Sequence, residues 1–169
     1  MHPPSERDIR DSFVNCSQGE AKRLSLPRDL GERPWDDLDF LGWQDISAPD
    51  RCYLVAERED GGLTGVALRL PAKRRRSFLH RNLCSLCLTT HPGSGVALMT
   101  ARRAGAAGRK GDSVGDYICT DLDCSLYTRG RKAPAPGGRI EESLSVEEQI
   151  ARTRANLFAF LDKVLATAG

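Results

Sequence analysis

Four of the six cysteines in the sequence fall into two close pairs, and this spacing limits what the chain can fold into. Cys84 and Cys87 form a C-x2-C pair, and Cys119 and Cys124 form a C-x4-C pair. Two thiolates at such spacing can bind one side of a tetrahedral Zn²⁺ ion, and a second pair completes the shell. Because four sulfur ligands leave no open position, we predict one Zn²⁺ ion with a structural role.

Other roles for the cysteines remain open at this point. A disulfide framework needs an oxidising compartment, and the N-terminus has no apolar segment typical of a secretory signal. A redox C-x-x-C motif needs a thioredoxin-like context, which the sequence lacks. Four unrelated buried thiols are a third alternative. His91, four residues after Cys87, could replace one cysteine as a ligand, but we interpret it as a loop residue. We interpret Cys16, on a helix, and Cys52, on a strand, as small buried hydrophobic residues.

The hydrophobic pattern predicts an α+β fold: two β-hairpins with flanking helices and a zinc-binding treble clef. We predict a helix over 5–24 that begins after Ser5, a short helix over 34–43, a hairpin of 51–58 with 63–70, and a second hairpin of 94–103 with 113–120 that has a mobile, glycine-rich tip. We expect the two tryptophans of 34–43 to form a compact aromatic core.

A further short helix is expected to start near Asp121, with Asp121 as its N-cap, and to place Cys124 in its first turn, where the helix dipole favours a thiolate. A cysteine turn, a hairpin and then a helix is the arrangement of a treble clef. Ser145 and Glu148 form a capping box for a C-terminal helix. The apolar stripe of that helix is Ile150, Leu157, Leu161, Val164 and Leu165.

The length of 169 residues is that of one domain. We divide residues 1–169 into helices and the first hairpin (5–70), the treble-clef zinc module (77–130), a linker rich in proline, glycine and positive charge (131–144), and the C-terminal helix (145–166). The sequence contains no run of 18 apolar residues and no secretory signal. We therefore expect a soluble, cytoplasmic protein with no membrane partner.

Charge is distributed unevenly along the chain. Residues 1–60 contain 8 basic residues (Lys and Arg) and 14 acidic residues (Asp and Glu). Residues 61–140 contain 14 basic residues and only 4 acidic residues. This asymmetry indicates an anionic partner, either a nucleic acid or an acidic protein surface. The basic residues include the run Lys73–Arg76, which precedes the first cysteine pair, and zinc could draw them onto one surface. The alternative is that the acidic flanks neutralise the basic segment on folding.

Motifs for catalysis are missing from the sequence. It contains no P-loop, no G-x-S-x-G motif and no H-E-x-x-H motif. Three histidines are a poor supply of acid–base groups, and we interpret Asp121 and Asp123 as helix-capping residues rather than a catalytic pair. We therefore expect a protein that is not an enzyme and has no small-molecule substrate.

The second cysteine pair lies in the segment Y-x-C-x-D-L-x-C-S, from Tyr117 to Ser125. This segment, the LCSLC turn around Cys84, the W…LGW segment from Trp35 to Trp43 and the LRLP end of the first hairpin resemble the treble-clef zinc domain of the FusB-type, or fibronectin-binding-protein-like, elongation factor G-binding proteins. The resemblance extends from about residue 5 to residue 165.

The resemblance implies a zinc-stabilised α+β domain with the four paired cysteines as ligands. FusB-type proteins bind the translational GTPase EF-G, help to release it from the ribosome and protect translation from fusidic acid. Their contact surface lies on the zinc domain, and the candidate partner-binding residues here are Ser85, Leu86, Arg102, Arg103, Arg109, Lys110, Tyr117 and Tyr127. FusB-type resistance proteins carry a helical bundle before this domain, and the present sequence starts almost at it.

We therefore expect a non-enzymatic zinc protein that binds EF-G and modulates its release from the ribosome, with a contact to rRNA as a further possibility. The alternative is a treble-clef RNA-binding protein that contacts phosphates. Such a protein would bind generic RNA with an affinity that falls steeply with salt concentration.

Overall fold

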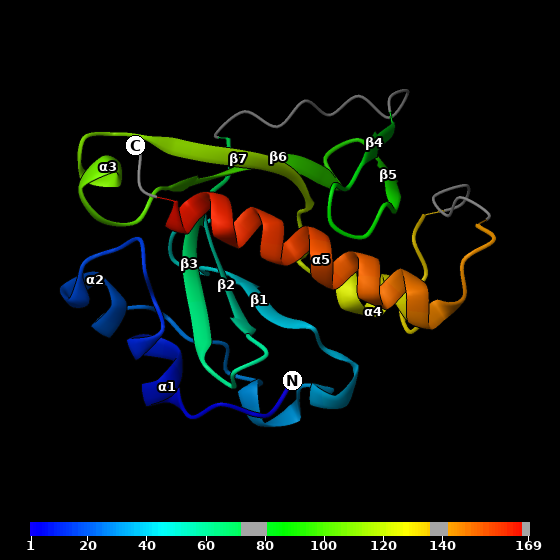
Figure 1. The fold of residues 1–169 in the computed structure, drawn as a ribbon, viewed down its shortest axis with the longest axis horizontal. Helices are drawn as coiled ribbons and strands as arrows, with labels where there is room; N and C mark the ends of the chain where they lie inside the picture. The colour runs from blue at the N-terminus through cyan, green and yellow to red at the C-terminus, as the bar shows by residue number, and fades with distance from the viewer. Residues whose placement is uncertain (72–80, 136–141, 167–169) are drawn as a thin grey trace.

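The computed structural model describes residues 1–71, 81–135 and 142–166, and in these ranges the chain is an α+β fold. Five strands form one antiparallel sheet in the order β1 (Phe40–Gln44), β2 (Arg51–Glu57), β3 (Leu63–Arg69), β6 (Val96–Arg102) and β7 (Ser113–Cys119) (Figure 1). A separate small sheet consists of β4 (Arg81–Leu83) and β5 (Thr90–Pro92). The helices are α1 (Glu6–Asp11), α2 (Gln18–Lys22), α3 (Gly105–Arg109), α4 (Cys124–Thr128) and α5 (Val146–Leu165).

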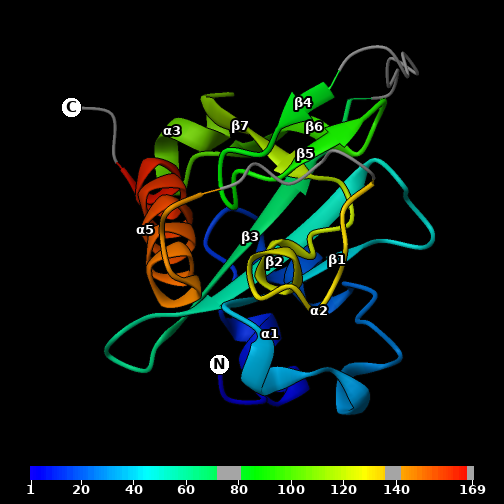
Figure 2. The same ribbon diagram turned by 90° about the vertical axis from the view of Figure 1, so that its right-hand side faces the viewer.

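Both faces of the first hairpin are covered, because alternate residues of β2 enter two different hydrophobic cores. Cys52, Leu54 and Ala56 belong to the larger core, which also contains the buried face of α5. Tyr53 and Val55 belong to a smaller core that is closed by residues of the N-terminal segment. Since successive side chains of a strand point to opposite faces, one apolar run supplies both cores. Helix α5 lies along one side of the sheet (Figure 2).

Both predicted hairpins are confirmed. In the first hairpin, β2 pairs with β3, with Arg51 opposite Arg69 at one end and Glu57 opposite Leu63 at the other. In the second, β6 pairs with β7, with Val96 opposite Cys119 and Arg102 opposite Ser113. The glycine-rich tip of the second hairpin contains the short helix α3. The capping box of α5 is also present, with Ser145 and Glu148 in reciprocal hydrogen bonds. Within the predicted stripe, Leu157, Leu161 and Val164 are buried, whereas Ile150 is only partly buried and Leu165 is exposed. Phe160, which lies outside the predicted stripe, is also buried.

The predicted helix over 5–24 is wrong in its middle. Ser5 caps α1 as expected, but α1 ends at Asp11, and a second capping box at Ser17 starts α2. The intervening backbone pairs with β3 instead: Val14 N–H donates to the carbonyl oxygen of Gly65, and Gly65 N–H donates to that of Ser12. Cys16 therefore lies between two short helices and is only partly buried, which corrects its interpretation as a buried helical residue.

The predicted helix over 34–43 is also wrong. Only a 3-10 turn, Trp35–Asp37, forms there, and the chain then enters β1. Phe40 and Leu41 enter different cores, which is the alternation of a strand buried on both faces. The predicted aromatic core exists around Trp43, whose ring centroid lies 5.1 Å from that of Tyr53 and 6.3 Å from that of Phe13. Trp35 is only partly buried and packs against this core.

The side-chain amide of Asn15 joins the two hairpins where the sheet opens. β3 and β6 share one pair of residues, Arg69 and Thr100, so continuation of that register would place Ala67 opposite Arg102. Asn15 fills this gap: its Nδ2 donates to the carbonyl oxygens of Ala67 (2.9 Å) and Arg102 (3.0 Å), and its Oδ1 accepts from Ala67 N–H (2.7 Å).

Replacement of Asn15 by alanine should lower the free energy of unfolding by about 1–3 kcal/mol, because backbone groups of β3 and β6 lose their partners. Chemical denaturation followed by circular dichroism measures this change. Gln18→Ala, at an exposed position of α2, is the control and should have little effect. Equal stability of the two variants would show that Asn15 does not hold the hairpins together.

Candidate metal centre

Four buried sulfur atoms converge at one end of β7. The Sγ atoms of Cys84, Cys87, Cys119 and Cys124 all lie within 4.8 Å of one another. The sulfurs of Cys84 and Cys124 are 3.7 Å apart, and those of Cys87 and Cys119 are 3.6 Å apart. A tetrahedron of sulfurs bonded at about 2.3 Å to a central Zn²⁺ has edges of about 3.8 Å. The four cysteines therefore fit a tetrahedral zinc ion, and both close contacts link one cysteine pair to the other.

The same distances exclude disulfides in this structure, since a disulfide needs sulfurs about 2.0 Å apart. All four residues are free cysteines. Without a cation, the sulfurs cannot all carry charge. Hydrogen bonds from neighbouring thiols, first from that of Cys119, lower the pKa of Cys87. The hydrogen bond between Cys124 and Cys119 instead raises the pKa of Cys124. A bound divalent cation would allow every ligand to be a thiolate.

The first cysteine pair is held in a tight turn after β4. Leu88 N–H donates to the carbonyl oxygen of Cys84 (3.0 Å), and Cys84 N–H donates to that of Thr89 (2.9 Å). Ser85 N–H donates to the carbonyl oxygen of Tyr117 (2.7 Å), which attaches the turn to β7. Leu88 adopts the left-handed region with φ of 56°. For an L-residue this backbone conformation costs about 1–2 kcal/mol, so other contacts must hold the turn closed.

The second pair spans the end of β7 and the start of α4. Cys119 is the last residue of β7, and Cys124 is the first residue of α4, as predicted. The N-cap position is occupied by Asp123 and not by Asp121, and its side chain makes no capping hydrogen bond. The predicted cap was therefore misplaced. The carboxylate of Asp121 instead accepts the hydroxyl of Tyr127 (2.6 Å) and the ammonium of Lys132 (3.0 Å).

Leu122, between the two ligands of this pair, packs on the backbone of β1. It is buried and has φ of 60°. A Cβ placed on Gly42 would lie 2.4 Å from the Cβ of Leu122, so only glycine allows the approach. The loop between the metal ligands thus lies directly against the sheet.

A buried ion pair holds α4 to the segment before β1. Arg129 donates to both carboxylate oxygens of Asp39, at 2.6 and 2.9 Å, and the side chain of Asp39 is only 1% exposed. The hydrogen bonds to Asp39 raise the pKa of Arg129. Asp39 N–H also donates to the hydroxyl of Ser125 (3.0 Å). Two-point recognition of this kind fixes orientation as well as distance.

His91 lies beside the sulfur cluster without belonging to it. It is a buried residue of β5 and not a loop residue, which corrects the sequence-based interpretation. Its Nε2 is 3.5 Å from the sulfur of Cys119, and its ring packs edge-on against Tyr127 with centroids 4.8 Å apart. Burial lowers its pKa, so the neutral ring is favoured. The ring therefore shields one side of the site.

Residues 8–164 match the family described as FBP C-terminal treble-clef zinc-finger. The chain belongs to this family. In this structure the cysteine turn, the hairpin of β6 and β7 and helix α4 come together around one site, in agreement with the treble clef that the family description names.

Among solved structures, that of the fusidic acid resistance protein FusC is similar to this chain, with a TM-score of 0.63 and 19% sequence identity. The similarity covers 96% of this chain and 59% of FusC, so the chain spans less than two thirds of that protein's length. At this identity the similarity shows the fold alone. No curated protein sequence matches the chain.

Two of the predicted partner-binding residues lie in the interior of this FBP-family fold. Leu86 is fully buried, and its carbonyl oxygen accepts from the side chain of Asn156 on α5 (3.0 Å). Tyr127 is buried between His91 and Asp121. Neither side chain is available to a partner in this structure, and both stabilise the metal centre instead.

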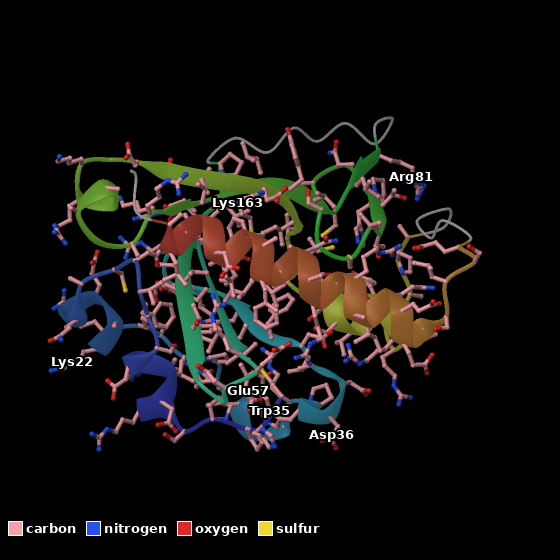
Figure 3. The ribbon with its side chains drawn as sticks, viewed as in Figure 1. Lys22, Trp35, Asp36, Glu57, Arg81 and Lys163 are labelled. Atoms are coloured by element: carbon pink, nitrogen blue, oxygen red, sulfur yellow. The ribbon has the colours of Figure 1, made fainter. Side chains whose placement is uncertain are left out.

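The remaining candidates separate into two groups. Ser85 and Tyr117 lie at the metal end of β7, and Arg102, Arg103, Arg109 and Lys110 lie at the other end, around α3. A seven-residue strand spans about 20 Å, so the basic residues around α3 lie well away from the metal site. Figure 3 shows Arg81 of β4 near the metal end and Lys163 on the C-terminal part of α5, where the carbonyl oxygen of Lys163 accepts from Arg103. Residues 73–76, His80 and Arg139 lie outside the described residues.

Sequence reasoning missed two exposed apolar residues near the cysteine turn. Leu98 is 42% exposed and pairs directly with Tyr117 across β6 and β7, and Leu83 of β4 is 44% exposed. The alternation of β6 between buried and exposed residues could have indicated Leu98 once the hairpin was predicted. No membrane-spanning helix, long and apolar enough for a bilayer, occurs among the described residues.

Replacement of Gly42 by alanine should destabilise the protein by about 1–3 kcal/mol and weaken its hold on zinc, because the new methyl group would displace Leu122 and its neighbouring ligands. Thermal unfolding and competition with a colorimetric zinc chelator measure the two effects. Gly31→Ala is a matched control, since a Cβ at Gly31 would meet nothing within 4 Å. If Gly42→Ala keeps the zinc affinity of Gly31→Ala, the contact between β1 and the ligand loop has no influence on the metal.

Proposed function

We propose that this chain is a non-enzymatic, cytoplasmic zinc protein that binds EF-G through its metal-bearing module and promotes release of the factor from the ribosome. The observation that carries this proposal is the family match over residues 8–164 together with the convergence of the four sulfurs. The similarity of the fold to that of FusC, a fusidic acid resistance protein, also supports this proposed function.

One zinc ion held by Cys84, Cys87, Cys119 and Cys124 would have a structural role. Its chemistry in this site is to neutralise and fix four thiolates. The buried sulfurs, the two left-handed leucines and the shielding ring of His91 fit a closed shell rather than an open catalytic position. No substrate is needed for the proposed activity.

The surface that fits a protein partner best lies on the outer face of β6 and β7 beside the cysteine turn. Tyr117 is 49% exposed, and Leu98 and Leu83 are exposed near it. Ser85, hydrogen-bonded through its N–H to the Tyr117 carbonyl, extends this surface onto the turn. Aromatic and aliphatic side chains presented by rigid strands are typical anchors of protein interfaces.

Release of EF-G would require only a difference in affinity. A protein that binds the free or departing form of the factor better than the ribosome-bound form shifts the equilibrium towards release. The size of the shift is limited by that difference in affinity, and no covalent step is involved.

Replacement of Cys119 or Cys124 by serine should abolish zinc binding and unfold the metal module, because the binding energy of such a site is also folding energy. Zinc content by atomic absorption and thermal unfolding by circular dichroism measure this result. Cys16→Ala should retain one zinc ion per chain. A soluble Cys124→Ser protein that unfolds cooperatively without metal would overturn the structural role of zinc.

Titration of EF-G into the wild-type protein should give 1:1 binding, and Tyr117→Ala should weaken it by about 30-fold, the equivalent of about 2 kcal/mol for an interface anchor. Isothermal titration calorimetry measures both affinities. Leu165→Ala, which also truncates an exposed apolar residue, is the control at the distant end of α5 and should bind normally.

The proposal fails if EF-G does not bind to the wild-type protein, or if Tyr117→Ala and Leu165→Ala bind with equal affinity. In the second case EF-G contacts another face of the molecule.

A further inference from the structure

We propose that an arginine groove at the end of the sheet distant from the metal centre binds the phosphate backbone of single-stranded RNA. The groove is defined by Arg23, Arg51, Arg69, Arg102, Arg103 and Arg109. This inference goes beyond the proposed function, because it concerns a different surface and a different ligand.

The groove consists of two adjoining hollows of about 220 and 320 Å³. Both are lined by Asn15, Cys16, Glu20 and Arg102, so they form one continuous depression. It lies where the two hairpins separate and where the amide of Asn15 replaces direct pairing of β3 with β6. The groove therefore lies beside the opening in the sheet that the side chain of Asn15 bridges.

The arginines reach the groove from separate elements. Arg23 follows α2, Arg51 begins β2, Arg69 ends β3 and Arg102 ends β6. Arg51 and Arg69 are directly opposite each other on adjacent strands. Like charges in that position destabilise a sheet, so packing alone gives no reason for the pair. An anion bound between them would convert the repulsion into two attractive contacts.

Most of the six guanidinium groups form no direct ion pair with the described residues. Arg51, however, hydrogen-bonds to the side chain of Tyr53. Hydrogen bonds from Ser17, and then the charges of Arg102 and Arg51, lower the pKa of Glu20. Arg69 pairs with Asp50, and Arg103 donates to carbonyl oxygens at the C-terminal end of α5. Within the described part of the chain, Arg23, Arg51, Arg102 and Arg109 form none of the ion pairs.

Two carboxylates also line the groove, and each accepts hydrogen bonds close to its own position in the chain. Glu20 accepts from the backbone N–H and hydroxyl of Ser17, and Asp45 accepts from the N–H groups of Ser47 and Ala48 and from the hydroxyl of Tyr53 (3.3 Å). These carboxylates leave the groove with an excess of positive charge, since it contains six arginines.

The chemistry of the groove favours a phosphate backbone over an acidic protein. Among the described residues, none of the large exposed hydrophobic side chains, such as Ile46, Leu98 and Tyr117, lines either hollow, so a protein partner would find no apolar anchor there. The planar guanidinium group matches phosphate oxygens in a two-point geometry. The ring of Tyr53 is buried, so it offers no exposed face for stacking, and we expect binding that is independent of base sequence.

The thiol in the groove does not point to catalysis. Burial, followed by the charge of Glu20, raises the pKa of Cys16 to about 11, so the sulfur stays protonated at neutral pH. A protonated thiol is a poor nucleophile, and the groove is consistent with binding alone.

The test uses the full-length zinc-loaded protein and a fluorescently labelled 12-nucleotide oligouridylate, with anisotropy measured over a series of salt concentrations. The expected result is binding whose log affinity falls linearly with log salt, with a slope of about 0.7 per phosphate contacted. Arg51→Gln/Arg102→Gln should lower the affinity at least tenfold and reduce the slope by about 1.4, because two contacts are lost. Arg7→Gln/Arg28→Gln, two exposed arginines outside the groove, is the matched control for net charge and should bind as the wild type does.

Three results would overturn the proposal. An equal loss in both double variants would mean that the attraction is a general effect of charge. Competition by inorganic phosphate as strong as that by RNA would mean a site for one small anion. Competition by oligoglutamate of the same length, equal to that by unlabelled RNA, would mean an acidic protein partner. Titration of EF-G into the same variants distinguishes failure of this proposal from failure of the proposed function. Because the arginine groove lies away from Tyr117, both double variants should bind EF-G as the wild type does.

Discussion

The rest of the structure depends on the packing of four sulfur atoms in one buried site. Cys84, Cys87, Cys119 and Cys124 belong to two segments separated along the chain, and all lie within 4.8 Å of one another. Buried sulfurs so close together cannot all be ionised without a cation, and two leucines beside them adopt left-handed backbone conformations. A divalent metal resolves both problems, since it stabilises the thiolates and supplies binding energy that offsets the strained turns.

The order imposed at this site extends into the sheet through two contacts with the chain around β1. Leu122 lies against Gly42, and Arg129 pairs with the buried carboxylate of Asp39. Helix α5 closes the same core and is joined to the cysteine turn by the hydrogen bond from Asn156 to Leu86. The metal module and the N-terminal half are therefore packed together as one structural unit. The exposed face of β6 and β7 lies at one end of this unit, and the arginine groove lies at the other.

The features that sequence reasoning predicted correctly are those that depend on neighbours along the chain. The spacing of the cysteines indicated the site, the Ser145–Glu148 capping box indicated the start of α5, and apolar runs around a glycine turn indicated the hairpins. The errors concern residues whose structure depends on distant partners. Residues 12–15 pair with β3, and β1 is buried on both faces, so a helical spacing of apolar residues was misleading. Leu86 and Tyr127 were predicted to contact a partner, but α5 and His91 cover them.

The most direct test of the central claim is X-ray absorption at the zinc K-edge of the purified wild-type protein, with the metal content measured on the same sample. The account predicts one zinc ion per chain and a single shell of four sulfurs at about 2.3 Å. A shell of three sulfurs and one nitrogen would make His91, whose Nε2 lies 3.5 Å from the Cys119 sulfur, a ligand in place of a cysteine. That result, or a folded protein without zinc, would contradict the closed four-sulfur centre.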